Sequence, residues 1–219
     1  PLGGPSIAID PHGEVIAAIN QADLTRQLQL AWDQGLRSCA IVFMHGYRYH
    51  AHEQRAAEIA KQVGFSQISV SHQVSPLMKL IGRGDTTVVD SYLSPVLRRY
   101  IDQFTDALGH CPLQFMQSNG GLTQADSFAG KDAVLSGPAG GVVAMAETAK
   151  QAGIHAIIGL DMGGTSTDVT LYDGEYERTF DTEVAGVRIQ APMMKIHTVA
   201  AGGGSLLSFD GFGSGLRLN

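Results

Sequence analysis

The segment Asp161-Met-Gly-Gly-Thr-Ser-Thr-Asp168 contains the residues of this chain whose types and spacing best suit chemistry. Backbone N–H groups at the two glycines, with the hydroxyls that follow, could form a neutral cradle for an anion. Asp161 could hold Mg²⁺ directly or through water, and Asp168 could order water or metal. The pattern therefore predicts phosphate binding through backbone, hydroxyls and metal. The candidate binding residues of the turn are Gly163, Gly164, Thr165, Ser166 and Thr167.

Short strands on either side must position this turn. Residues 155–161 and 166–172 are apolar runs that predict two strands joined by the Gly-Gly-Thr turn. Asp173-Gly174 indicates a hairpin leading into a third strand at about 175–182. Such an antiparallel meander is not a βαβ unit, which argues against a dinucleotide-binding interpretation of the glycines. A Walker loop is also excluded, because no lysine occurs in the turn.

Helices and apolar strands alternate through the rest of the chain, and this alternation predicts an α/β fold. Gly64 is placed to end the helix predicted at 51–63, and Pro138 is placed to begin the one predicted at 139–150. Pro95 is expected to kink the helix predicted at 85–108. The predicted helices are 22–36, 51–63, 85–108 and 139–150. The predicted strands are 39–44, 67–71, 113–118 and 133–136, preceded by an extended pair over 6–19.

Composition excludes several classes of protein. The 219 residues carry 15 Lys and Arg against 21 Asp and Glu, a net charge of −6, and this acidity without a basic run argues against nucleic-acid binding. No apolar stretch approaches the roughly 20 residues that span a bilayer, and the N-terminus lacks the pattern of a secretory signal. We therefore expect a cytoplasmic chain without membrane contact. Cys39 and Cys111 suit reduced thiols.

Structural interpretations compete with the functional ones. A Gly-Gly-Thr turn alone is more often a tight turn. Phosphate is favoured by its combination with Asp161, Asp168, the Asp-Gly hairpin and the preceding helix of small residues. The run 136–141 could be a closely packed helix start or a helix N-terminus that faces phosphate. Asn119-Gly120-Gly121 has the composition of an ordinary turn. The histidines at 45, 50 and 52 fit no common zinc spacing, so we interpret them as part of a polar loop.

The motif DMGGTSTDV resembles the phosphate-binding hairpin of the actin, sugar-kinase and heat-shock chaperone ATPase superfamily. Within that superfamily, several further motifs together resemble the hydantoinase A/5-oxoprolinase family, and the resemblance covers nearly the whole chain. These motifs are SNGGL, LSGPAGG, LDMGGTSTDV, VAGVRIQAP, IHTVAAGGGS and the upstream TTVVDSYLSPVLRRY.

The resemblance implies a fold of two ribonuclease-H-like lobes, incomplete in this chain. Family members are longer and begin with a first phosphate hairpin, of which no copy precedes residue 161. We therefore expect a fragment in which residues 1–150 form the later part of the first lobe and 151–219 begin the second lobe. Because nucleotide is held between two lobes in this architecture, we expect the fragment alone to be inactive.

The resemblance also implies a function, the ATP-dependent opening of a cyclic amide such as 5-oxoproline or a hydantoin. ATP and Mg²⁺ would be the cofactors, with Asp161 as the metal ligand and Asp161 and Asp168 as the catalytic carboxylates. Gly202, Gly203 and Gly204 would let backbone approach the adenosine or its phosphates. A hydantoinase B-type subunit or domain is the expected partner. Two alternatives stay open, a subunit of an ATP-dependent ketone carboxylase and a non-catalytic nucleotide-binding module.

Overall fold

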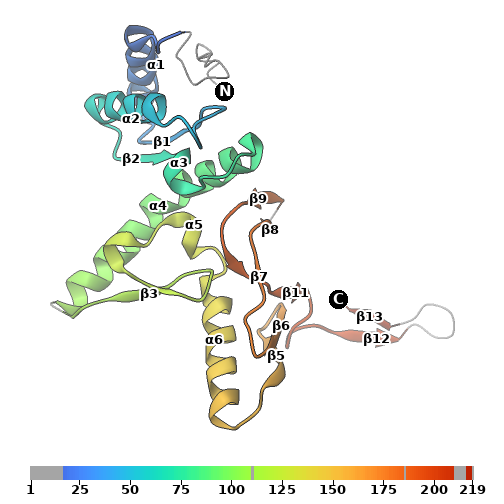
Figure 1. Cartoon of the computed structure of the whole chain (residues 1–219). Coiled ribbons are helices and arrows are strands. Elements are labelled where there is room, and N and C mark those ends of the chain that lie inside the picture. The colour runs from blue at the N-terminus through green and yellow to red at the C-terminus, as the bar shows by residue number, and fades with distance from the viewer. Residues whose placement is uncertain (1–16, 110, 185, 210–215, 219) are drawn as a thin grey trace. The chain divides into compact units, whose positions relative to one another are not determined.

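The computed structural model of the chain is an α/β structure and describes residues 17–109, 111–184, 186–209 and 216–218 (Figure 1). The chain forms two compact units. Unit 1 contains the described residues up to Leu113, together with Ala129–Lys131 and Asp181–Ala191. Unit 2 contains Gln114–Phe128, Asp132–Phe180 and the described residues from Pro192 onward. The predicted lobe boundary near residue 150 concerns the longer protein and stays a prediction.

Unit 1 is built on a parallel pair of strands, β1 (Ser38–Ile41) and β2 (Gln67–Val70). Helices α1 (Gln21–Asp33) and α2 (Ala51–Val63) pack against each other, and α2 also packs on both strands. The amphipathic spacing and the closing Gly64 predicted these two helices correctly, and the apolar runs predicted both strands. The remaining elements of this unit are α3 (Ser71–Val74), α4 (Leu80–Leu108) and the antiparallel hairpin of β8 (Thr182–Val184) and β9 (Val187–Ile189).

Helix α4 and the segment at 130–136 differ from the prediction. Helix α4 begins five residues earlier than predicted and continues through Pro95 to Leu108. The predicted strand at 133–136 is wrong, because Gly130–Ala133 is the short helix α5 and Leu135 takes a left-handed φ of 61° just before α6 (Ser136–Gln151). The hairpin of β3 (Gln114–Met116) and β4 (Leu122–Gln124) surrounds the Asn-Gly-Gly turn, and the 3₁₀ turn Ala125–Ser127 follows it.

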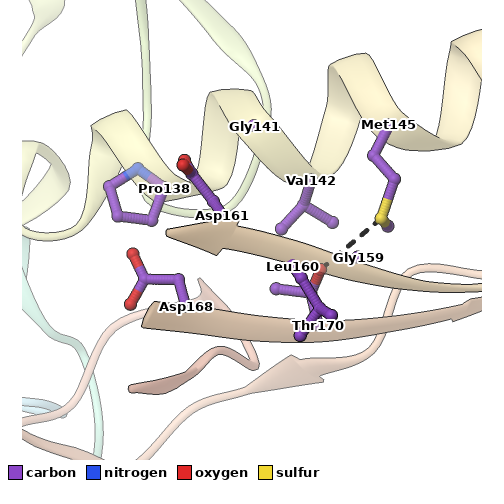
Figure 2. Close-up of a pocket in the computed structure, with 9 residues that line it drawn as sticks. All are labelled: Pro138, Gly141, Val142, Met145, Gly159, Leu160, Asp161, Asp168 and Thr170. Atoms are coloured by element: carbon purple, nitrogen blue, oxygen red, sulfur yellow. Dashed lines mark hydrogen bonds between the residues drawn. The ribbon is translucent and has the colours of Figure 1, made fainter. Parts of the chain in front are cut away.

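Unit 2 centres on the antiparallel sheet β11-β6-β5, against which α6 packs (Figure 2). Its strands are β5 (Ala156–Met162), β6 (Thr167–Asp173) and β11 (His197–Val199). The strand predicted at 175–182 is not part of this sheet. Only an isolated bridge joins Tyr172 to Tyr176, and β7 (Arg178–Thr179) pairs with β10 (Met193–Met194) instead. The last two strands, β12 (Leu207–Phe209) and β13 (Leu216–Leu218), pair with each other.

Three sequence-based expectations concern simpler features. Within the described ranges, none of the helices combines the length and the apolarity needed to cross a bilayer. Both cysteines are free thiols, and burial raises the pKa of the Cys39 thiol to about 11, so this thiol is protonated at neutral pH. The extended pair expected over 6–19 falls, except for its last three residues, outside the described part of the chain.

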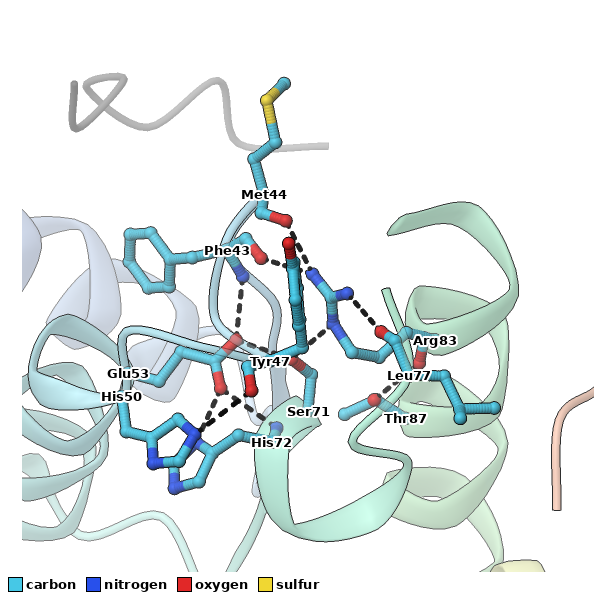
Figure 3. A network of polar contacts seen from close by, with 10 residues as sticks. All are labelled: Phe43, Met44, Tyr47, His50, Glu53, Ser71, His72, Leu77, Arg83 and Thr87. Atoms are coloured by element: carbon cyan, nitrogen blue, oxygen red, sulfur yellow. Dashed lines mark hydrogen bonds and ion pairs between the residues drawn. The ribbon is translucent and has the colours of Figure 1, made fainter. Parts of the chain in front are cut away.

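A buried charge network stabilises unit 1 at the carboxyl ends of β1 and β2 (Figure 3). The Glu53 carboxylate, which is fully buried, accepts hydrogen bonds from the Phe43 N–H (2.8 Å), the Ser71 hydroxyl, and the N–H and ring Nδ1 of His72 (3.0 and 2.6 Å). Arg83 from α4 is equally buried, and it donates to the Ser71 hydroxyl and to main-chain carbonyls that include Met44 O. The network therefore joins α2, α4 and the loop after β1.

This network makes the stability of unit 1 dependent on pH. Burial raises the pKa of the Glu53 carboxyl, but the hydrogen bonds from Ser71, Phe43 and His72 outweigh that effect and hold its pKa below the ordinary value of 4.5. A carboxyl whose pKa is lowered by folding contributes stability that is fully present above its unfolded pKa and is lost as pH falls through the folded pKa.

We expect Glu53→Gln to lower the free energy of unfolding by about 3 kcal/mol at pH 7, because the carboxamide NH₂ would face another donor. The difference between wild type and variant should shrink as pH falls below 4.5. Thermal or urea unfolding followed between pH 3 and pH 7 measures this. Glu58→Gln, on the exposed face of the same helix, is the matched control. If the free energies of unfolding of wild type and Glu53→Gln differed by the same amount at all pH values, the ionised Glu53 carboxylate would not be the source of the stability.

Candidate functional site

The pairing of β5 with β6 places the two predicted carboxylates directly opposite each other. Asp161 on β5 is the register partner of Asp168 on β6, so both side chains lie on the same face of the hairpin. Directly opposed like charges destabilise a strand pair unless something neutralises them. Asp168 receives a hydrogen bond from Thr198 of β11, whose hydroxyl donates to Oδ1 at 2.7 Å, but this bond leaves the charge of the carboxylate in place. The arrangement therefore favours a cation between or beside the two carboxylates.

The turn between these strands is held closed by backbone hydrogen bonds. The Gly163 N–H donates to the Ser166 carbonyl at 2.9 Å, which closes the turn on itself. Thr167, expected to present its hydroxyl to a ligand, is buried, and its Oγ1 donates to the Ala201 carbonyl at 2.6 Å. These two groups therefore hold the turn in shape, and their predicted part in ligand binding stays a prediction.

The Gly202–Gly204 segment packs against this turn backbone to backbone. The Gly203 N–H donates to Gly163 O at 2.9 Å, and the Gly204 N–H donates to Gly164 O at 2.8 Å. A Cβ at Gly202 would lie 2.6 Å from Gly163 O and 2.7 Å from Thr165 N, so any side chain there would collide with the turn. The structure thus brings the two predicted glycine clusters together.

Two amides of the turn are left for a ligand. Among the hydrogen bonds of the described residues, none uses the N–H of Gly164 or of Thr165. Both residues are exposed, and space is open around Gly164. Consecutive backbone N–H groups of this kind bind anions, phosphate oxygens above all.

A cavity of about 200 Å³ lies beside the turn, between α6 and the β5–β6 hairpin (Figure 2). Figure 2 shows the Asp161 and Asp168 carboxylates near Pro138, which is in the first turn of α6. Gly141 leaves room in the next turn, since a Cβ there would lie 3.8 Å from Asp161 Oδ2. Pro138 and Gly141 of this helix start therefore line the cavity, and the expected contact of the helix N-terminus with phosphate stays a prediction.

Sequence reasoning missed the long-range part of this site. Thr198 contacts Asp168 from a strand 30 positions away, and only the pairing of β11 with β6 reveals it. Nowhere in the described ranges do three or more His, Cys, Asp or Glu side chains cluster as a metal centre would require. A cation here would rest on two carboxylates at most, which suits Mg²⁺, because Mg²⁺ keeps several waters and phosphate ligands.

The other motifs singled out in the sequence have structural roles. The Gly121 N–H donates to Asn119 Oδ1 at 2.7 Å, the internal bond of an ordinary turn. The ring of His50 stacks on that of His72, 4.4 Å between centroids, beside the Glu53 network. That stacking agrees with the polar-loop interpretation of the histidines.

Comparison with known proteins identifies the family. The model of the hydantoinase/oxoprolinase family matches residues 83–217, and that of the hydantoinase/oxoprolinase N-terminal region matches residues 6–64. The 5-oxoprolinase of Dictyostelium discoideum is 44% identical over 213 residues, which cover 90% of this chain and 17% of that protein. The chain thus spans about one sixth of the length of this relative.

Two solved structures share the fold. The ATP-dependent caprolactamase of Pseudomonas jessenii superposes with a TM-score of 0.82 at 33% identity, over 94% of this chain and 31% of that one. In sequence, its subunit alpha is 34% identical over 97% of this chain. The nucleotide-free structure of acetone carboxylase gives a TM-score of 0.79 at 22% identity, over 97% of this chain and 31% of that one, and this likeness shows the fold alone. The expected α/β fold class is confirmed, and the chain belongs to the hydantoinase/oxoprolinase family.

Proposed function

We propose that this chain is part of a longer enzyme that uses ATP and Mg²⁺ to open a cyclic amide of the 5-oxoproline or hydantoin type. The observation that carries the proposal is the juxtaposition of Asp161 and Asp168 beside a turn with two unused backbone amides. The relatives supply the substrate class, because one is a 5-oxoprolinase and another is an ATP-dependent caprolactamase, and both names specify lactams.

The chemistry requires activation, because a lactam carbonyl is a poor electrophile. Transfer of the γ-phosphoryl group of ATP to the lactam oxygen releases ADP and leaves the ring carbon open to attack. Water adds to that carbon, the ring C–N bond breaks as nitrogen takes a proton, and an acyl phosphate forms. A second water then releases phosphate and the open-chain acid. The sum is one cyclic amide, one ATP and two waters converted to the open-chain product, ADP and phosphate.

The residues of the hairpin suit the phosphoryl-transfer half of this reaction. The amides of Gly164 and Thr165 would hold phosphate oxygens where charge accumulates, and one such donor is typically worth a few kcal/mol in the transition state. Asp161 would hold Mg²⁺, which neutralises phosphate charge, and Asp168 would complete its coordination or orient its water. The hydrogen bond from Thr198 holds the Asp168 carboxylate in position for that role.

The comparisons also bear on the alternative reaction and on a partner subunit. Ketone carboxylation is supported only by the likeness to acetone carboxylase, which at 22% identity carries the fold and not the reaction. A relative described as subunit alpha favours a second subunit as partner, and the family resemblance suggests that this partner is a subunit or domain of the hydantoinase B type. We propose a cytoplasmic setting, which suits both a reaction that consumes ATP and a chain with two free cysteines.

In the full-length protein, Asp161→Asn should lower kcat for ATP-dependent opening of 5-oxoproline by at least about 100-fold and raise the Mg²⁺ concentration needed for half-maximal rate. Asp173→Asn, at the far end of the same hairpin, should change neither. The measurement is the formation of glutamate, which is the ring-opened product of 5-oxoproline, together with ADP in a coupled assay. Without Mg²⁺ and ATP, Asp161→Asn should be as stable as wild type or more so, because it removes the repulsion across the strand pair.

Three results would count against the proposal. Full activity of Asp161→Asn would remove the carboxylate from the mechanism. ATP binding without stimulation of hydrolysis by 5-oxoproline, a hydantoin or caprolactam would favour the non-catalytic module. Phosphate release stimulated by acetone with bicarbonate, and by no lactam, would favour the carboxylase.

Substitutions at Gly202 and Gly203 test whether ATP binding in the full-length protein needs the shape of the 163–165 turn. Gly202→Ala should weaken ATP binding more than 10-fold and destabilise the protein by about 1–3 kcal/mol, because its Cβ would force the turn out of shape. Gly203→Ala is the matched control, since its Cβ would meet Gly163 O at an ordinary 3.7 Å. Calorimetric titration with Mg-ATP and thermal unfolding provide the two readouts. Equal effects of the two substitutions would show that the close approach at Gly202 is not needed.

A further inference from the structure

A second cavity, of about 710 Å³, lies in unit 1 between the start of α4 and the β8–β9 hairpin. Its wall combines basic, acidic and amide side chains with the backbone of the first helical turn. The charged and amide residues that line it are Lys79, Asp181, Glu183, Arg188 and Gln190. None of them belongs to the phosphate site, which lies in unit 2.

The amide of Gln190 is buried in this wall with one of its atoms unpaired. The side chain is 4% exposed, and its Nε2 donates to Asp181 Oδ1 at 2.6 Å. Its Oε1 has no hydrogen-bond partner among the described residues, although burying such an oxygen unpaired costs stability. Gly82 also lines the cavity, and a Cβ at this position would lie 2.3 Å from the Gln190 oxygen. Any residue larger than glycine would therefore displace the Gln190 amide.

The main chain of Gln190 is held rigidly, so the unpaired oxygen is preorganised. Its N–H donates to the Thr86 hydroxyl at 2.8 Å, and its carbonyl accepts from the Ser75 hydroxyl at 2.8 Å. The Gln190 oxygen is thus an acceptor that the fold positions but does not satisfy. A ligand N–H would satisfy it.

The start of α4 adds an anion-binding element to the same cavity. The N-cap residue Lys79 makes no side-chain cap, the first turn carries no acidic residue, and the first intrahelical bond is the one from Arg83 N–H to Lys79 O. The amides of 80–82 are therefore the orphan donors of a 29-residue helix. Lys79 and Arg188 also line the cavity and carry positive charge, and Arg188 lies opposite Glu183 in the register of β8 and β9.

We propose that this cavity binds a small ligand that carries one carboxylate next to an amide N–H. The carboxylate lies at the N-terminus of α4 between Lys79 and Arg188, and the N–H donates to Gln190 Oε1. Asp181 and Glu183 balance the charges of Lys79 and Arg188 in the same wall, so the cavity does not attract polyanions such as nucleotides. The identification of this ligand as a cyclic amide with a ring carboxylate, such as 5-oxoproline, rests on the function proposed above.

Calorimetric titration of the full-length protein with 5-oxoproline, in the absence of ATP, tests this proposal. Arg188→Gln should raise the Kd for 5-oxoproline about 10-fold or more, and should leave the Kd for 2-pyrrolidinone, the same ring without the carboxylate, unchanged. Arg26→Gln, which removes the same charge from the exposed face of α1, should change neither value. The corresponding lactone, in which ring oxygen replaces the N–H, should bind wild type at least 10-fold more weakly than 5-oxoproline.

The outcomes separate this proposal from the proposed function. Binding of 5-oxoproline that depends on Arg188, without ATP-dependent ring opening, would support the cavity and overturn the function. Ring opening with a KM that Arg188→Gln leaves unchanged would support the function and overturn the cavity. An equal loss of affinity for 5-oxoproline and 2-pyrrolidinone, or equal binding of lactone and lactam, would also overturn the cavity proposal.

Discussion

The register of β5 against β6 is the constraint on which the candidate site depends. Because side chains alternate between the faces of a strand, a slip of one residue would move Asp168 to the opposite face from Asp161. Long-range contacts oppose such a slip: the Thr167 hydroxyl is bonded to Ala201, and the Asp168 carboxylate to Thr198. Strand β11 and the residues that follow it thus fix the pairing that places the two carboxylates together, and the same segment brings Gly202–Gly204 onto the turn.

Local patterns in the sequence were sufficient for most elements and for the turn. The apolar spacing in 22–36 and 51–63 and the strand-like run before Asp161 depend on neighbours a few residues away, and the structure has the corresponding elements. The strand at 133–136 failed because an apolar triplet fits a strand and a helix end equally well. The third strand of the meander failed because β6 pairs with β11, and no turn residue encodes a partner so distant.

Helix α4 shows where periodicity misleads about environment. Its apolar positions recur at every fourth residue from Val88 to Leu108, yet Val88, Tyr92 and Val96 are all more than half exposed. The buried face instead carries polar residues that find partners, as Thr86 does with Gln190 and Asp90 with Ser69. Helical spacing therefore predicted the helix correctly, but pairing of polar groups decided which side is buried.

Polar groups that serve stability in this chain have hydrogen-bond partners within the protein, whereas some of those at the candidate sites lack them. Glu53 and Arg83 are fully buried, and each is surrounded by hydrogen-bond partners, as a network that serves stability must be. Gln190 Oε1 is the one buried side-chain polar atom in the described part of the chain without a partner, and Asp161 and Asp168 put two acidic residues at directly opposed register positions. Folding alone gains nothing from either feature, and both cost stability. A bound donor at Gln190 or a cation at the hairpin would recover that cost, so each exception marks a place where a ligand completes the structure.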